Sequence, residues 1–164
     1  MQRFDRKPDI GYIPTEAEAI AEVLKLAEVA ASDVFYDLGC GDGRLLIAAA
    51  QQFGTRGVGV DIDPERIQKA KEDAARASVS NLVEFRHQDL FETNFSDATV
   101  VFLYLLPHLN LRLRPQLFRQ LKPGTRIISR DFDMGEWLPE RSLQLQTPEE
   151  PKFYRWTIGI TTSN

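Results

Sequence analysis

The sequence predicts an α/β protein with a doubly wound, seven-stranded sheet that is mostly parallel and ends in an antiparallel hairpin. Three observations lead to this prediction. Short apolar runs alternate with helical patterns of apolar residues between residues 34 and 129, which is typical of repeated strand–helix units. A glycine-rich turn joins the first of these runs to the helical pattern that follows it. Near the end of the chain, apolar and polar residues alternate one by one, as in half-buried antiparallel strands.

The first expected element is a helix that starts with a capping box. The Thr15 hydroxyl can accept the N–H of residue 18, and the Glu18 side chain can bond back. Apolar residues of this helix recur at helical spacing (Ile20, Val23, Leu24, Ala27). The first strand covers residues 34–38 and is almost continuously apolar, as a strand buried on both faces should be. The next helix, over residues 44–53, ends at Gly54.

Further strand–helix units follow. After a strand at residues 57–61, Asp63 is the expected N-cap of a helix that has Pro64 at its first position and extends to Ala77. The helical stretch before residue 122 contains Pro115, which we expect to open a second part of it. Right-handed crossovers then place helices on both faces of the sheet. The remaining parallel strands are expected at residues 82–86, 98–104 and 125–129.

The last part of the chain changes character. Residues 131–141 show no helical pattern. Two strands are expected at residues 143–146 and 152–160, joined through a turn with two prolines. We expect a single domain over residues 1–164, with residues 1–14 as a segment that covers the site.

Composition narrows the class of protein. The chain has 164 residues, a net charge of −4 and one cysteine, which excludes an internal disulfide. Its longest apolar run, residues 100–106, is far too short to span a membrane, and the charged N-terminus lacks the apolar core of a signal peptide. We therefore expect a cytoplasmic protein. The basic stretch at residues 112–130 is either a solvated surface or a docking surface for an acidic protein, lipid headgroups or RNA.

The glycine-rich turn reads Asp-Leu-Gly-Cys-Gly-Asp-Gly-Arg over residues 37–44. Arg44 stands where a dinucleotide-binding loop has its third glycine. Asp37 and Asp42 also make the loop acidic, and carboxylates repel a pyrophosphate at close range. Two carboxylates suit a cationic ligand instead. S-adenosyl-L-methionine (SAM) carries a sulfonium and an ammonium group and no phosphate.

Acidic residues also follow the next two strands, and open α/β sheets bind ligands at the carboxyl ends of their strands. Asp61, which lies 20 residues beyond Gly41, suits the two ribose hydroxyls. Asp89 can accept a hydrogen bond from the adenine amino group, while Ile62 and Leu90 pack on the two faces of the adenine ring. Each acid alone is more often a solvated loop residue; it is their succession after a glycine loop that favours a SAM site.

The loop at residues 37–44 resembles motif I of the class I SAM-dependent methyltransferases, which have a Rossmann-like fold. The wider chain resembles a small family that includes the protein-lysine methyltransferases of the ATP synthase c-subunit and of adenine nucleotide translocase. Residues 12–15 (Tyr-Ile-Pro-Thr) and residues 102–107 carry this narrower resemblance. It implies SAM as cofactor, held by Asp37, Gly39, Cys40, Gly41, Asp61, Ile62, Asp89, Leu90, Thr15 and Tyr104.

In the resembled enzymes, a Tyr-x-x-Thr element at the position of Tyr12 and Thr15 lies over the methionine end of SAM. The alternative is that Tyr12 only covers the core and that Thr15 only caps a helix. We assign no residue to a metal ion.

The methyl acceptor is expected at the end of the fourth strand, at Tyr104-Leu105-Leu106-Pro107. Enzymes that methylate planar amide or adenine nitrogens have Asn/Asp-Pro-Pro-Tyr here, and the leading acceptor residue is missing in this chain. An aromatic and apolar rim suits a lysine side chain, because desolvation favours the neutral amine. That amine can attack the sulfonium methyl in line. We therefore assign catalytic positions to Tyr104, Pro107 and Tyr12.

No general base is evident in the sequence. His108 is one candidate, although a lone histidine after a strand is more often a surface residue. Asp131, Asp133 and Glu136 either form an acidic rim for a cationic substrate or belong to a solvated loop. The preferred function is transfer of a methyl group to a protein lysine. Alternatives are an RNA or small-molecule methyltransferase, a non-catalytic SAM-binding subunit and, less favoured, a nicotinamide-dependent oxidoreductase. The oligomeric state is left open.

Overall fold

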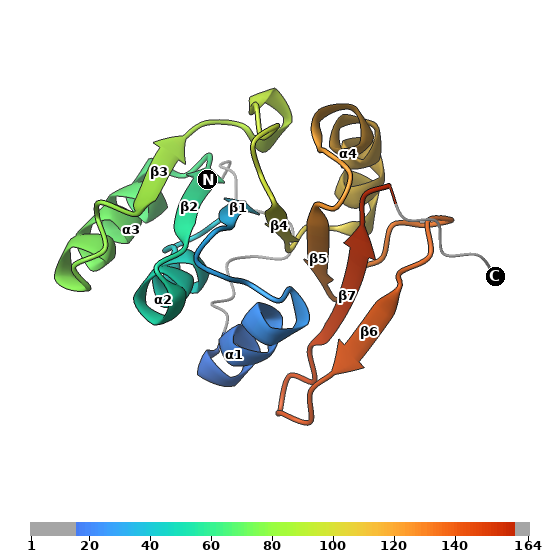
Figure 1. Cartoon of the computed structure of the whole chain (residues 1–164), viewed down its shortest axis with the longest axis horizontal. Coiled ribbons are helices and arrows are strands. Elements are labelled where there is room, and N and C mark those ends of the chain that lie inside the picture. Colours follow the sequence, from blue (N-terminus) through green and yellow to red (C-terminus); the bar gives the residue numbers. More distant parts are fainter. Residues whose placement is uncertain (1–15, 160–164) are drawn as a thin grey trace, which may run out of the picture.

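The computed structural model describes residues 16–159, which fold around one seven-stranded sheet with strand order β3-β2-β1-β4-β5-β7-β6 (Figure 1). The strands are β1 (Val34–Leu38), β2 (Arg56–Asp61), β3 (Val83–His87), β4 (Val100–Leu103), β5 (Arg126–Arg130), β6 (Arg141–Gln144) and β7 (Lys152–Thr157). The helices are α1 (Ala17–Leu26), α2 (Arg44–Phe53), α3 (Pro64–Arg76) and α4 (Pro107–Gln120), with a short 3-10 turn, η1 (Leu90–Glu92).

The sheet has the predicted doubly wound topology. Strands β1 to β5 are parallel, and β7 inserts antiparallel between β5 and β6. From β1 the chain winds outward through β2 and β3, and then returns to β4 on the other side of β1. The strand order therefore reverses between β1 and β4. This switch point is where open α/β sheets bind their ligands.

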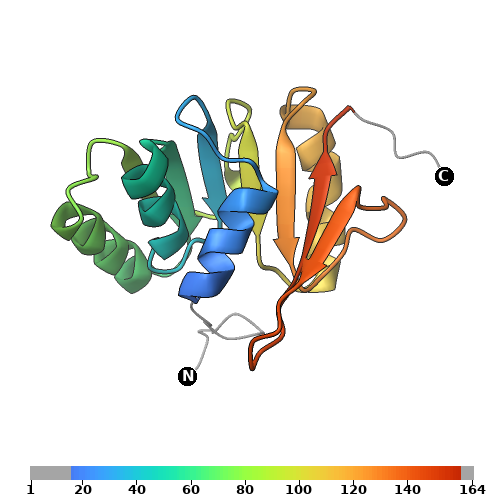
Figure 2. The same cartoon turned by 60° about the horizontal axis from the view of Figure 1, so that its bottom comes forward.

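Helices cover both faces of the sheet. Phe35, Phe85 and Phe102 point to the face that buries apolar residues of α1, α2 and α3. Leu38 and Trp156 point to the opposite face, where α4 packs. Figure 2 shows α1, α2 and α3 in front of the sheet and α4 behind it. No helix within residues 16–159 is long and apolar enough to cross a membrane.

Residues after β5 cover the part of the second face that α4 leaves open. Trp137 packs between Phe118 of α4 and Trp156 of β7, with ring centroids 4.6 and 5.6 Å apart. The indole N–H of Trp156 donates to the Trp137 carbonyl at 2.7 Å. A loop rather than a helix thus completes this face, as the missing helical pattern predicted.

Two predicted helix features are wrong. Pro115 lies inside α4 and does not divide it. The helix continues because Leu113 and Leu117, on either side of the proline, are fully buried against the sheet, and this packing outweighs one lost backbone hydrogen bond. The N-cap of α1 also differs from the prediction: it is Glu16, without a side-chain cap, and not the preceding threonine. Thr15 lies outside the described residues.

The second strand of the terminal hairpin begins where predicted, but the first begins earlier. β6 starts at Arg141, two residues before the expected start, because its pairing with β7 begins opposite Arg155. The Leu145 N–H still donates to the Pro151 carbonyl at 3.0 Å, beyond the end of β6. One residue of β6 is half-buried and the other three are exposed, so the alternation of apolar and polar residues gave little information on where this strand begins and ends.

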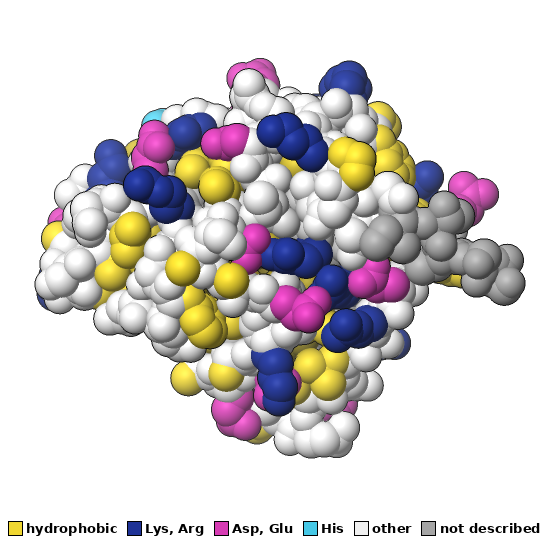
Figure 3. Space-filling model, viewed as in Figure 1, with side chains coloured by type: hydrophobic (Ala, Val, Ile, Leu, Met, Phe, Trp, Pro, Cys, Tyr) yellow, Lys and Arg dark blue, Asp and Glu magenta, His cyan; other side chains and the backbone are white. Residues whose placement is uncertain are grey.

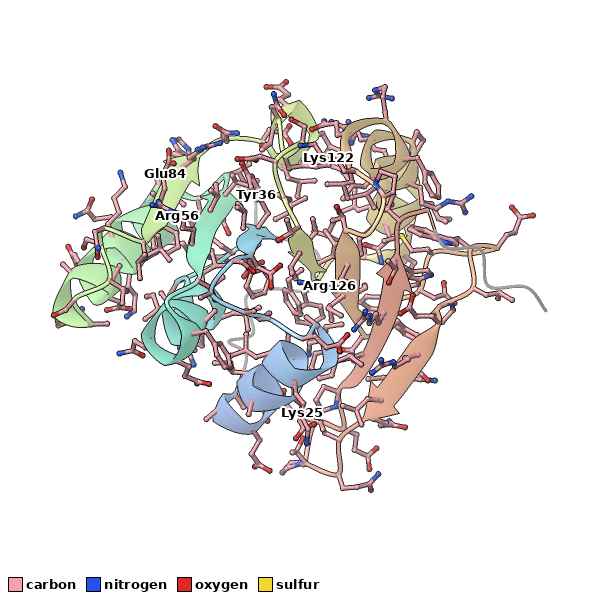
Figure 4. The ribbon with its side chains drawn as sticks, viewed as in Figure 1. Lys25, Tyr36, Arg56, Glu84, Lys122 and Arg126 are labelled. Carbon is pink, nitrogen blue, oxygen red and sulfur yellow. The ribbon has the colours of Figure 1, made fainter. Side chains whose placement is uncertain are left out.

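Ion pairs fasten the sheet near the amino ends of the parallel strands. Asp33, just before β1, accepts from Arg126 of β5 at 2.6 Å and from the Thr99 hydroxyl at 2.8 Å. Arg155 of β7 donates to the Leu26 carbonyl and to Glu28, both at 2.7 Å. In Figure 3, acidic and basic side chains alternate in the middle of the face that is shown. Figure 4 has the same viewpoint and labels Arg126, one of these ion-pair residues.

Candidate functional site

The glycine loop after β1 forms a tight backbone cradle. Gly39, Gly41 and Gly43 all have positive φ angles, of 92°, 58° and 77°. The N–H groups of Gly39 and Cys40 donate to the Val60 carbonyl at 2.8 and 2.9 Å. The loop is therefore fixed to the end of β2 by its backbone, as well as by the conformations that glycine permits.

Close packing also requires glycine at two positions. A Cβ atom on Gly43 would lie 2.5 Å from the Phe85 ring, and one on Gly59 would lie 2.8 Å from the Cys40 sulfur. Our sequence analysis did not assign a role to Gly59. Its position in the middle of an apolar strand was the available signal, since glycine weakens a strand unless something approaches it closely.

Asp37 brings a buried carboxyl group to the cradle. It is 4% exposed, and no residue among those described donates a hydrogen bond to its carboxyl oxygens. Burial, and then the charges of Asp61 and Asp42, raise the pKa of Asp37 well above its usual value. A buried acid without a partner is costly. The site therefore favours a cation at this place.

Asp61 supports the cradle from the end of β2. Its Oδ2 accepts from the Gly41 N–H at 3.0 Å and its Oδ1 from the Asp63 N–H at 2.9 Å. Burial raises the pKa of Asp61, although these two hydrogen bonds and Arg66 act in the opposite direction. The structure thus shows that Asp61 braces the loop, while its contact with a ribose stays a prediction.

The Asp42 carboxylate forms an ion pair with Arg44. Its Oδ2 accepts from Arg44 Nη2 at 2.7 Å, and its Oδ1 from the Arg44 backbone N–H at 3.3 Å. We expected Asp37 and Asp42 to form the acidic pair. In the structure the Asp42 carboxylate is bonded to Arg44, while the charges of both Asp61 and Asp42 act on the Asp37 carboxyl.

Residues predicted to hold adenine lie at the ends of β2 and β3. Ile62 is 63% exposed beside the cradle, and its carbonyl is 3.0 Å from His87 Nε2. Asp89 accepts from the Phe91 N–H at 2.9 Å and so caps η1, a role that we did not predict. Leu90 is half-buried next to it. The contacts of all three predicted residues with adenine stay predictions.

Cys40 is a packing residue. Its side chain is buried, and burial followed by the charges of Asp37 and Asp61 raises the pKa of its thiol. The thiol therefore stays protonated and weakly reactive.

The end of β4 lies beside the cradle, because β4 pairs with β1. A Cβ atom on Gly39 would lie 3.8 Å from the Leu105 side chain, so Leu105 borders the cradle. Tyr104 is half-buried, whereas Pro107, the first residue of α4, and His108 are exposed. Tyr12 and Thr15 lie outside the described residues. The predicted acceptor residue Tyr104 therefore lies at the strand end beside the cradle, and its contact with the methyl acceptor stays a prediction.

Arg130, at the end of β5, lies beside the predicted acceptor residue Tyr104, and our sequence analysis did not assign it to the site. Its guanidinium carbon is 4.9 Å from the centre of the Tyr104 ring. Glu149, Glu16 and Asp131 lie 3.2, 3.6 and 3.8 Å from its nitrogens. Asp131, which we predicted to belong to an acidic rim for a cationic substrate, thus lies beside Arg130.

Two other predicted rim acids, Asp133 and Glu136, are exposed, and the Asp133 carboxylate accepts from the Gly135 N–H in a local turn. Their contact with a cationic substrate finds no support in this arrangement.

The basic stretch at residues 112–130 does not form one basic surface. Arg112 lies 4.0 Å above the Phe91 ring, and Arg114 donates to the Met134 carbonyl. Arg126 pairs with Asp33, and Figure 4 shows it well apart from Lys122, which lies at the turn after α4. These side chains face different parts of the molecule, which removes much of the case for a nucleic-acid surface here.

A model of the ANTKMT methyltransferase domain family matches residues 37–141, which include the cradle and the acceptor end. The chain belongs to this family. It is 38% identical to a protein-lysine N-methyltransferase of Saccharolobus islandicus (strain REY15A), over 85% of this chain and 87% of that protein. It is 30% identical to the Homo sapiens lysine N-methyltransferase of the ATP synthase c-subunit, over 82% of this chain and 57% of that protein.

A solved structure with high similarity is that of an RNA methyltransferase from Salinibacter ruber in complex with S-adenosyl-L-homocysteine. It is 51% identical, with a TM-score of 0.86, and covers 93% of this chain and 96% of that chain. The names of these relatives therefore agree on methyl transfer and differ on the acceptor. This ANTKMT family member is a SAM-dependent methyltransferase.

SAM fits the chemistry of the site. The Asp37 carboxyl, which has no hydrogen-bond donor among the described residues, suits the ammonium group of the methionine part, and the glycine cradle lets a ligand approach the backbone closely. Asp61 and Ile62 offer an acceptor and an apolar contact for the ribose and adenine.

Proposed function

We propose that this methyltransferase acts on the ε-amino group of a lysine in a protein. The observation that carries the proposal is the character of the acceptor end. Arg130 lies 4.9 Å from the centre of the Tyr104 ring, and three carboxylates (Glu16, Asp131, Glu149) lie within 3.8 Å of the Arg130 nitrogens. An acidic and aromatic site attracts a cationic side chain. The names of the archaeal and animal relatives support the same substrate class.

Bound SAM supplies a methyl group on a positively charged sulfur. The chain must then present a neutral amine in line with that methyl group, since only the neutral amine has a free electron pair. With SAM held in the cradle, formation of the new N–C bond would break the S–C bond of SAM, and the electron pair of that bond would stay on sulfur. The extra proton on nitrogen leaves to water or to a nearby carboxylate, for which Asp131 is half-buried near Tyr104.

Tyr104 and Pro107 have different roles in this proposal. The half-buried Tyr104 ring contacts and partly desolvates the acceptor amine, which favours loss of its proton. Pro107 is the first helical residue of α4, where its fixed φ angle sets the direction of the chain after Leu106. Tyr12 would complete the cover over the methionine end.

RNA is the second candidate acceptor, because the 51% identical Salinibacter ruber protein is described as an RNA methyltransferase. The arrangement of charge is less favourable for it. Three carboxylates at the acceptor end repel phosphates, and the basic residues of the 112–130 stretch are dispersed or paired.

The test is transfer of a radiolabelled methyl group from SAM in a cell lysate, with the Asp37→Ala variant as the inactive control. We expect label that survives ribonuclease, is removed by protease and is recovered as methyl-lysine after acid hydrolysis. Label that ribonuclease releases would replace the lysine proposal with the RNA alternative. Mass spectrometry of the labelled band then identifies the target protein.

A further inference from the structure

Arg130 is almost completely buried, although its guanidinium is only partly bonded. The residue is 1% exposed, and its Nη2 donates one hydrogen bond to Glu149 Oε1 at 3.2 Å. Its Nε and Nη1 atoms are buried and have no hydrogen-bond partner within residues 16–159. Buried donors without partners are costly, so Arg130 is not optimised for stability alone.

The surroundings of Arg130 nevertheless hold the guanidinium in place. Its carbon lies 4.9 Å from the Tyr104 ring centre and 6.0 Å from that of Phe153, which is within reach of cation–π attraction. Glu16 and Asp131 lie 3.6 and 3.8 Å from its nitrogens, too far for hydrogen bonds but close enough for strong attraction in a buried site.

These partners come from separate parts of the chain. Tyr104 follows β4, Glu16 precedes α1, and Glu149 belongs to the turn between β6 and β7. Figure 2 shows the start of α1, this turn and the carboxyl ends of β4 and β5 at the same edge of the sheet. Asp131 is fixed independently, because its N–H donates to the Lys152 carbonyl and its Oδ1 accepts from the Lys152 N–H.

We propose that Arg130 is a positioning residue for methyl transfer: it fixes the Tyr104 ring and fastens the start of α1 and the β6–β7 turn around the methyl acceptor. The inference rests on the proposed function in one respect, namely that Tyr104 contacts the acceptor. It also makes the β6–β7 turn a wall of the acceptor site, so that the terminal hairpin contributes to substrate selection.

Arg155 provides a matched control. It is also a buried arginine, on β7, which pairs with β5, and carboxylates of Glu28 and Glu140 lie 2.7 and 3.0 Å from it. Its Nη1 reaches the Leu26 carbonyl at the end of α1, whereas Arg130 approaches Glu16 at the start of that helix. Ten helical residues span about 15 Å, so Arg155 lies far from Tyr104.

The first experiment compares Arg130→Met and Arg130→Lys with Arg155→Met and Arg155→Lys. We expect Arg130→Met to lower kcat by about tenfold or more, because a displaced acceptor contact slows the chemical step. The Kd of SAM should change less than about threefold, since the cradle is formed by other residues. Arg130→Lys should recover part of the loss through its charge but not all, because it lacks the planar guanidinium.

Arg155→Met should lower the melting temperature while its kcat, measured well below that temperature, stays close to that of the parent. Equal kcat values for Arg130→Met and Arg155→Met would overturn the proposal. So would a loss in Arg130→Met that lies entirely in SAM affinity, because Arg130 would then be a cofactor ligand. If Arg130→Met does not fold, Glu149→Gln provides the same test in milder form. It weakens the one side-chain hydrogen bond that Arg130 makes within residues 16–159. Because Glu149 is half-exposed, this substitution should leave the fold intact.

A second readout does not depend on the acceptor. In protein with ¹³C-labelled tyrosine, the ring signal of Tyr104, assigned with Tyr104→Phe, should shift in Arg130→Met and stay in place in Arg155→Met. An unmoved Tyr104 signal would contradict the positioning role. If the parent enzyme methylates RNA, the lysine proposal fails. The kcat values of the Arg130 and Arg155 variants are then compared with RNA as the acceptor, and they still test the positioning role of Arg130.

Discussion

Asp61 Oδ2 accepts a hydrogen bond from the Gly41 N–H at 3.0 Å, which ties the glycine loop of one strand to the end of the next. The same carboxylate is the predicted ribose ligand. We therefore expect Asp61→Asn, which loses one of its two backbone contacts and the charge, to weaken SAM binding by about tenfold or more. Isothermal titration calorimetry with SAM measures the effect. Asp63→Asn is the control, because it changes the same charge two residues away without touching the loop; equal Kd values for the two variants would refute the role of Asp61.

The Asp37→Asn substitution should make the protein more stable and at the same time weaken its binding of SAM. Because burial and nearby acids raise the pKa of Asp37, the folded protein holds a proton that the unfolded chain releases. Without SAM, this group therefore lowers the free energy of unfolding as pH rises above the ordinary aspartate pKa. The Asn variant should be more stable than the parent at neutral pH and yet lose SAM binding by about tenfold or more. Urea unfolding at pH 4.5 and 7.5 tests the sign: the advantage of the variant must grow with pH, and a decrease would show that the carboxyl is stabilised when ionised.

The affinity for SAM should also increase with pH. A cationic ligand binds the ionised form of Asp37, and protonation at low pH competes with binding. We expect Kd to fall as pH rises through the elevated pKa of Asp37 and then to level off. Measurements below about pH 6.5 keep the α-amino group of SAM almost fully protonated. The Asp37→Asn profile should be flat where its affinity is measurable, and a flat profile for the parent would mean that another charge controls binding.

Gly43→Ala should be far more harmful than Gly54→Ala. Both glycines have similar φ angles, of 77° and 72°, so both substitutions carry the strain of a left-handed alanine, about 1–2 kcal/mol. Only at Gly43 does the new Cβ meet the Phe85 ring, at 2.5 Å, whereas nothing lies within 4 Å at Gly54. Overpacking adds about 1–3 kcal/mol at Gly43. Chemical denaturation of the two variants measures the difference, and similar losses would indicate that the Phe85 ring moves aside freely.

Pro115→Ala should stabilise the protein by about 1–2 kcal/mol. The alanine restores a backbone N–H inside α4, and the gain in helix propensity exceeds the entropy that proline removes from the unfolded chain. Pro107→Ala is the control, since the first helical position needs no N–H donor and should show no gain. A thermal melt of both variants decides the matter; a destabilised Pro115→Ala would show that the proline shape is needed at this point of the helix.

Much of the fold and the cradle could be predicted because their signals are local. Apolar runs marked the parallel strands, and consecutive strand ends placed Asp37, Asp61 and Asp89 at one edge of the sheet. The role of Arg130 could not be predicted in this way. It meets Glu149 only because β7 inserts between β5 and β6, and that pairing depends on tertiary structure. The same limit explains α1, whose Glu16 is turned toward Arg130 rather than toward its own helix.

Trp137 shows that a partial signal can still be useful. The absence of a helical pattern after β5 indicated a loop, but the stacking of Trp137 between Phe118 and Trp156 needs the antiparallel strand to bring Trp156 beneath it. Pro115 shows the opposite case, in which a strong local rule was overridden by two buried leucines.

The ion pairs of Asp33 and Arg155 have a consequence for how new specificities arise in this scaffold. They secure the strands at one edge, whereas the acceptor contacts occupy the opposite edge. Substitutions that retarget the enzyme can therefore accumulate around the β6–β7 turn without loosening the anchors that keep the sheet assembled. A directed-evolution library restricted to that turn should retain a high fraction of folded members while sampling different acceptors.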